Sequence, residues 1–177
     1  DVRSMQQARE RAREERARIG DSAEGLLERL VLHLESAYSV SLVAMTPAQM
    51  RGSDAEVDGD RILRFRETLT EPERLMHFAH ELGHLVLHKR LVDRDIVIDE
   101  IIASAYGDAG PGAIARYSPR VREEAEAKAF AHEFLCPAAQ ALARWRAGTD
   151  DTTITSVAAD FHVDGRTAAI QLAKDNK

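Results

Sequence analysis

The chain of 177 residues is 44% hydrophobic and 31% charged, and its formal net charge is −6. This composition fits a globular domain with a real core, and the acidic balance excludes a general electrostatic attraction to nucleic acid. The single cysteine, Cys136, excludes an internal disulfide. The sequence has no apolar run long enough to span a membrane and no signal-peptide pattern. We therefore expect a cytoplasmic protein, and its start at Asp1 leaves room for an upstream domain.

Three regions are expected along the chain. Residues 1–20 should form a helical arm or connector, solvated because most of them are Arg, Glu, Gln and Ala. Residues 21–147 should form the core, and residues 148–177 a C-terminal segment with two short helices. Within the core, leucines at helical spacing predict a helix over residues 22–36.

Two strands should follow that helix. β-branched and apolar residues predict them over residues 38–45 and 61–65, and Gly and Asp predict a turn over residues 51–60. The next helix has a clear start at the capping-box pair Thr70 and Glu73, and it should end near residue 88. Further helices are expected over residues 119–135, 154–161 and 164–174.

His80, Glu81 and His84 form an HExxH sequence inside the helix that follows Thr70. Residues four apart lie one turn apart on the same helix face, with Cβ atoms about 6 Å apart, so two imidazoles can bind one ion. Glu81 is placed to accept a proton from a water that zinc has acidified. Gly83 lacks a side chain and lets another element pack close beside the ligands. We therefore predict a catalytic zinc site.

The apolar flanks of the motif support this interpretation. A helix that is apolar nearly all round is buried, and polar groups inside it need partners. His84 and His88 form a rival pair at the same spacing, but no glutamate follows His84. His88 is instead predicted to support the ligands or line the cleft, and His77 to be structural. The sequence reveals no partner for the other histidines.

The third ligand should come from the helix over residues 119–135, because a catalytic zinc usually has three protein ligands and one open position. That helix offers Glu123, Glu124 and Glu126. At about 100° per residue, Glu124 lies on the same stripe as the small Ala127, whereas Glu126 lies about 200° away from Glu124. Glu124 is the predicted ligand, with the other two as alternatives. Alternatively, all three carboxylates could simply complement the partial positive charge at the N-terminus of this helix.

Two stretches resemble the ImmA/IrrE metallopeptidases. They are residues 73–84 (ERLMHFAHELGH), preceded by the short strand RILRF, and residues 124–137 (EAEAKAFAHEFLCP). In that family a helix similar to ExxANxFAAxLLMP supplies the glutamate ligand from its first position, which is Glu124 here. The tail over residues 157–172 is similar to the family's helix-turn-helix-like segment. The resemblance covers about residues 40–175.

This resemblance implies an α+β, mainly helical, zincin-like fold of the gluzincin type with a small sheet. It also implies a regulatory zinc peptidase that acts on a repressor, often one with a helix-turn-helix, and so releases stress-response or mobile-element genes. The sequence departs from the family at Lys128, where Asn is usual, and at Cys136, where Met is usual. Lys128 is therefore a second candidate, with His88, for a residue beside the ligands.

We expect a zinc endopeptidase in which Glu81 moves protons for the attacking water. Tyr106, Tyr117 and His88 are candidates for the oxyanion donor. The segment over residues 104–120, rich in Gly and Pro, is a candidate gate over the cleft. The alternative function is a non-catalytic metal-binding regulator, or a module that binds DNA or a partner. The acidic tail makes direct DNA binding unexpected, and no membrane partner is expected.

Overall fold

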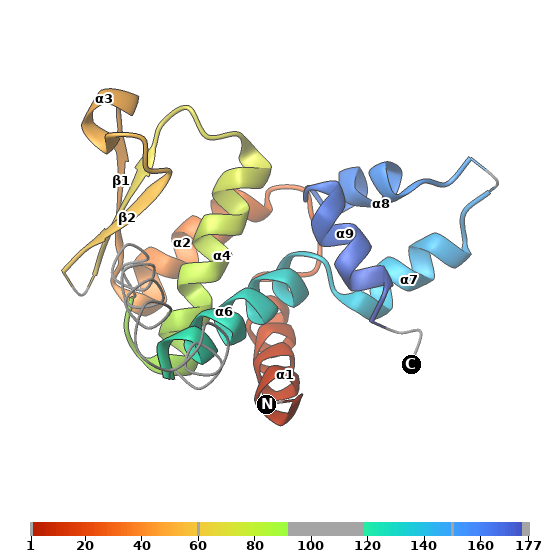
Figure 1. Cartoon of the computed structure of the whole chain (residues 1–177). Helices are drawn as coiled ribbons and strands as arrows, with labels where there is room; N and C mark the ends of the chain where they lie inside the picture. The colour runs from red at the N-terminus through yellow and green to blue at the C-terminus, as the bar shows by residue number, and fades with distance from the viewer. Residues whose placement is uncertain (1, 60, 92–118, 150, 175–177) are drawn as a thin grey trace, which may run out of the picture.

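The computed structural model describes residues 2–59, 61–91, 119–149 and 151–174, and its elements form a mostly helical α+β fold with one small sheet. In chain order these elements are α1 (Val2–Ile19), α2 (Leu26–Tyr38), β1 (Ser41–Met45), α3 (Pro47–Met50), β2 (Ala55–Asp58), β3 (Ile62–Arg66), α4 (Glu71–His88), α6 (Pro119–Leu135), α7 (Ala138–Arg146), α8 (Ile154–Asp160) and α9 (Gly165–Leu172). The sheet and helices α7–α9 lie at opposite ends of the molecule, with α4 and α6 between them (Figure 1). The expected α+β fold is confirmed. None of the described helices is long and apolar enough to cross a bilayer.

The sheet has the strand order β1-β3-β2, so β3 is its central strand. β1 runs parallel to β3, and β2 runs antiparallel to it. Leu63 and Phe65 of β3 are buried in the core. The predicted turn over residues 51–60 is wrong in part, because its second half forms β2. Pairing with β3 supplies the backbone hydrogen bonds of this short strand, and its Gly- and Asp-rich surroundings did not indicate them.

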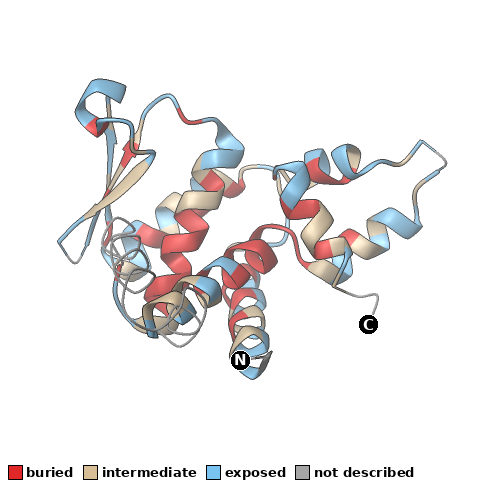
Figure 2. Cartoon of the chain, in the orientation of Figure 1, coloured by how far each residue is buried: buried red, intermediate tan, exposed pale blue. Residues whose placement is uncertain are grey.

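Helix α4 begins and ends where the sequence predicts. The Glu73 carboxylate accepts hydrogen bonds from the backbone N–H of Thr70 at 2.7 Å and from its hydroxyl at 2.8 Å. These bonds hold the pKa of Glu73 below its usual value. Every residue from Phe78 to Val86 is buried, and Figure 2 shows this buried stretch in the middle of the fold. The HExxH segment therefore lies in the core, as its apolar flanks predicted.

Helix α1 is helical as expected, but it is not a solvated arm. It packs against α6 and α4, and its Ala8 and Ala12 are fully buried. Arg16 is only 3% exposed and donates a hydrogen bond to the carbonyl of Phe134 at 2.6 Å. Small alanines let the two helices approach closely, and the buried charge has hydrogen-bond partners. The polar composition of α1 therefore did not indicate that one side of the helix is buried.

The two short helices expected at the C-terminus are α8 and α9, and α7 is an additional helix before them. The Asp164 side chain caps α9 by accepting the backbone N–H of Thr167 at 2.6 Å, which agrees with its predicted role. Gln171 of α9 is fully buried. It donates to the Glu133 carboxylate at 2.8 Å and to the Cys136 carbonyl at 2.7 Å. These bonds join α9 to the end of α6.

Candidate metal centre

His80 and His84 lie one turn apart on the buried part of α4. Their Nε2 atoms are 3.1 Å apart, and the residues are 5% and 0% exposed. The rings meet edge to face, with centroids 4.8 Å apart. Both imidazoles therefore turn the same nitrogen towards one point, as the spacing of four residues predicts.

Glu124 of α6 closes the group from the opposite helix. Its Oε2 lies 3.1 Å from His80 Nε2, and its Oε1 lies 2.9 Å from His84 Nε2. Among the described residues, these three form a group of potential ligands, with ligand atoms within 4.8 Å of one another. The two elements that carry them, α4 and α6, pack directly on each other.

Gly83 explains how α6 comes so close. A Cβ atom at this position would lie 3.1 Å from both the Cα and the carbonyl oxygen of Ala127, and 3.2 Å from Phe130 Cβ. Such distances are tighter than ordinary packing, and two of the three involve backbone that cannot rotate away. The absence of a side chain between the two histidines thus sets the separation of the helices. The prediction that Gly83 permits a close approach is confirmed.

The electrostatics of this group suit a cation. Burial alone would raise the pKa of Glu124, but the imidazoles of His80 and His84 outweigh it and hold the pKa well below the usual range. Glu124 Oε1 is a buried atom 2.9 Å from His84 Nε2, and it has no well-formed hydrogen bond within the described part of the chain. Two imidazole nitrogens and an ionised carboxylate are a ligand set that zinc prefers. The residues present therefore fit a zinc ion.

Glu81 follows His80 directly and is only 3% exposed. Burial removes a carboxylate from bulk water and strengthens its interactions with nearby protons and charges. Its place in the motif and its burial fit the role of a proton carrier.

The two alternative carboxylates have other partners. Glu123 forms a 2.7 Å ion pair with Arg90, and Glu126 lies 3.0 Å from His88. The three neighbouring glutamates of α6 therefore face different partners. Only Glu124 among them belongs to the group with His80 and His84 in the described structure.

The remaining predicted residues fall into three cases. His88 lies against His84, with their Nδ1 atoms 3.1 Å apart. Lys128 is exposed, and its positive charge contributes to lowering the pKa of His132. Tyr106, Tyr117 and the candidate gate up to residue 118 lie outside the described residues.

Two other histidines have partners that the sequence did not reveal. His33 lies 2.8 Å from the Glu15 carboxylate, which is 1% exposed, and His162 lies 3.1 Å from Glu71. Both pairs join residues that are far apart in the chain, so only the fold brings them together. Hydrogen bonds with His33 and the nearby Arg18 charge lower the pKa of Glu15 despite its burial.

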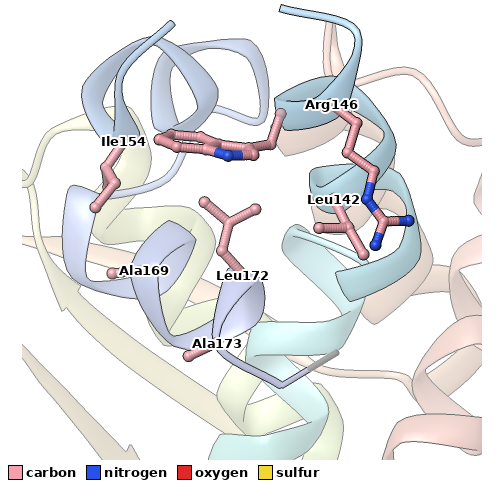
Figure 3. A pocket seen from close by; sticks show the side chains of 7 residues that line it. Leu142, Arg146, Ile154, Ala169, Leu172 and Ala173 are labelled. Atoms are coloured by element: carbon pink, nitrogen blue, oxygen red, sulfur yellow. The ribbon is translucent and has the colours of Figure 1, made fainter. Parts of the chain in front are cut away.

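A separate cavity of about 510 Å³ lies among α7, α8 and α9, and it contains none of the predicted site residues. Figure 3 shows apolar side chains from all three helices converging there, with Arg146 at one edge. The side chains that line it belong to Leu142, Trp145, Arg146, Ile154, Ala169, Leu172 and Ala173.

This α+β fold brings a buried HExxH helix against a glutamate from a second helix, and these residues could supply three protein ligands to one metal ion. The chain belongs to the peptidase family described as the IrrE N-terminal-like domain, whose family model matches residues 35–172. The resemblance that the sequence motifs indicated is thus confirmed.

The fold is also similar to the solved structure of a Mycobacterium tuberculosis transcriptional regulator. The TM-score is 0.68 at 20% sequence identity, and the match covers 97% of this chain and 48% of the regulator. The chain therefore spans about half the length of that protein. Among curated proteins, none matches the chain.

Proposed function

We propose that this protein is a zinc-dependent endopeptidase that cleaves a specific regulatory protein, a transcriptional repressor. The observation that carries the proposal is the convergence of His80, His84 and Glu124 between α4 and α6, with the buried Glu81 next to His80 in the sequence. Membership of a peptidase family supports a protein substrate.

The four residues have distinct tasks in this proposal. His80, His84 and Glu124 hold the ion, which supplies Lewis-acid polarisation and acidifies a water when bound. Glu81 accepts the proton of the attacking water and then passes it to the leaving amine.

Two observations support a regulatory substrate: the kind of protein that has a similar fold, and the charge of the C-terminal tail. The regulator from M. tuberculosis is a protein of transcription control. The tail has more acidic than basic residues, which suits a protein surface better than a phosphate backbone. Its charged residues are Asp150, Asp151, Asp160, Asp164 and Asp175 against Arg166, Lys174 and Lys177. We therefore assign the tail to protein recognition in the cytoplasm, where cleavage of a repressor would release stress-response or mobile-element genes.

The first test is metal content. We expect one zinc per wild-type chain and a loss of zinc in His80→Ala, His84→Ala and Glu124→Ala. Glu123→Ala is the matched control, because it removes the same charge from the same helix outside the ligand group. Equal zinc content in all these proteins would contradict the metal centre.

The second test is cleavage. Co-expression with candidate repressors encoded near the gene should yield one discrete cut, and Glu81→Gln should keep the zinc but lose the cut. Because removal of a general base typically costs about 10²- to 10⁴-fold in rate, the loss should be unmistakable. An unchanged rate in Glu81→Gln, or rapid digestion of casein at many sites by the wild-type protein, would count against the proposal.

A further inference from the structure

A chain of two hydrogen bonds leads from the candidate metal centre to Glu126 of α6. His84 Nδ1 lies 3.1 Å from His88 Nδ1, and His88 Nε2 lies 3.0 Å from Glu126 Oε2. The side chains of His84, His88 and Glu126 are 0%, 9% and 15% exposed, so little water competes for these bonds. Arg122, 3.7 Å from the other Glu126 oxygen, helps to hold the carboxylate in place.

The direction of this chain follows from the ligand role proposed for His84. His84 Nε2 faces His80 and Glu124, so it must offer its lone pair there to bind a cation. The ring proton of a neutral His84 then lies on Nδ1, which donates it to His88 Nδ1. His88 must accept at Nδ1 and therefore carries its own proton on Nε2, where the Glu126 carboxylate accepts it.

The reverse order would disable the site. If His88 donated from Nδ1, a neutral His84 would accept at Nδ1 and carry its proton on Nε2. That proton would occupy the nitrogen that the ion needs. An acceptor at Glu126 favours the first order, because a carboxylate accepts a hydrogen bond from His88 Nε2–H and cannot donate one.

We propose that His88 and Glu126 are positioning residues for the metal ligand His84. Glu126 selects the tautomer of His88, and His88 in turn fixes the ring orientation of His84 and keeps its Nε2 lone pair available. A metal-binding histidine usually donates its second N–H directly to a carboxylate, carbonyl or water. Here the imidazole of His88 lies between the ligand His84 and the carboxylate. Glu126 of α6 can therefore control the tautomer of His84 through His88. This inference rests on the proposed zinc site.

Zinc affinity, measured by competition with a chromophoric chelator, tests the inference. Loss of such a supporting residue typically weakens metal binding by about 10- to 100-fold. We expect that loss in His88→Phe and Glu126→Leu, and a smaller one in Glu126→Gln, whose amide oxygen still accepts from His88. Glu123→Gln is the matched control and should bind zinc as the wild type does, because Glu123 of α6 pairs with Arg90, which lies just beyond the end of α4.

Nitrogen-15 NMR of the zinc-loaded wild-type protein gives a second readout that a merely structural role would not produce. His88 should carry its proton on Nε2 with a bare Nδ1, and the Glu126→Leu variant should show a mixture of tautomers. This measurement on the wild type stands even where a variant fails to fold.

The outcomes separate this inference from the proposed function. A wild-type protein that binds no zinc would overturn the metal centre and the inference together. Tight wild-type binding with unchanged affinity in folded His88→Phe and Glu126→Leu would overturn the inference alone. So would a wild-type His88 that carries its proton on Nδ1.

Discussion

Gly83 lies between the two histidines and against the backbone of α6, so its environment permits a sharp prediction. Gly83→Ala would place a Cβ 3.1 Å from the Ala127 backbone and force the helices apart. We expect a loss of about 1–3 kcal/mol in the free energy of unfolding, typical of overpacking, together with weaker zinc binding. Urea unfolding and chelator competition would measure these two effects.

Gly165→Ala is the matched control for that substitution. Its Cβ would meet only Ile154 Cγ2 at 4.0 Å, an ordinary contact, at the start of a helix. We expect no loss there and a gain of up to about 1 kcal/mol from the higher helix propensity of alanine. Equal behaviour of the two variants would show that the close approach of α4 and α6 is not limiting.

His132 makes a prediction about acid stability. Burial, aided by the charges of Lys174 and Lys128, lowers the pKa of His132 to about 4. A histidine in the unfolded chain has a pKa of about 6.5, so between these pH values the unfolded chain binds a proton that the folded protein does not. The free energy of unfolding should therefore fall as the pH falls through this window.

His132→Gln should reduce that pH dependence. Urea unfolding of metal-free wild type and variant at about pH 7 and about pH 5 measures the difference, because both proteins share every other titrating group. Identical losses of stability on acidification would refute the assignment to His132.

The residues of the candidate site differ in how far the sequence could predict them. The convergence of His80 with His84 and the phase of Glu124 depend only on the helical repeat, so the spacing sufficed. The contact between His88 and Glu126 depends on how α4 lies across α6. That arrangement is set by packing at Gly83, and no local pattern reveals it.

At the scale of elements, α1 carries the clearest prediction. Arg16 is buried, which lowers its pKa to about 10, and it donates to the carbonyls of Phe134, Gly20 and Asp21 at 2.6, 2.9 and 2.8 Å. Arg16→Met would leave a buried carbonyl without its donor, at a cost of about 1–3 kcal/mol. Chemical denaturation would measure this loss.

Arg11→Met is the control on the same helix. Arg11 and its partner Glu14 have side chains that are 43% and 53% exposed, and surface pairs of this kind contribute less than about 1 kcal/mol. We expect an almost unchanged denaturation midpoint. A loss as large as that of Arg16→Met would mean that α1 contributes through helix propensity and not through its contact with α6.

Elements with strong local signals were predictable. The capping residues Thr70 and Asp164 place the starts of α4 and α9 correctly, because capping depends on neighbours within one turn. The burial of α1 was not predictable, since its polar side chains are buried by long-range pairing. β2 was missed because its few residues gain their strand structure from β3.

At the scale of the whole molecule, the proposed zinc site should contribute to global stability. An ion that binds only the folded protein adds about 4 kcal/mol at 1,000 times its Kd. For a chain of this size, that gain should raise Tm by about 10 °C. Calorimetry with and without zinc would measure the shift, and His84→Ala should abolish it. A zinc-independent Tm in the wild type would argue against a site formed only on folding.

The fold class and the family could be predicted from the sequence, because α4 and α6 contain the two motifs that indicate them. The division of the chain at residues 20 and 147 stays a prediction. The identity of the metal and of the substrate also remains a prediction, because neither is encoded in the packing of the described helices.

Helix α6 is held at both ends by different parts of the protein. Glu124 near its start faces the histidines of α4, while Glu133 near its end binds Arg13 of α1 and Gln171 of α9. A partner that displaced α9 would break the hydrogen bond between Gln171 and Glu133. It would thereby disturb α6, the helix that also carries Glu124. Because couplings between binding sites are reciprocal, zinc and that partner would change each other's affinity by one common factor, commonly about 5- to 150-fold. In the proposed peptidase, a protein that docked on the tail and displaced α9 would thereby change the affinity of the candidate metal centre for zinc.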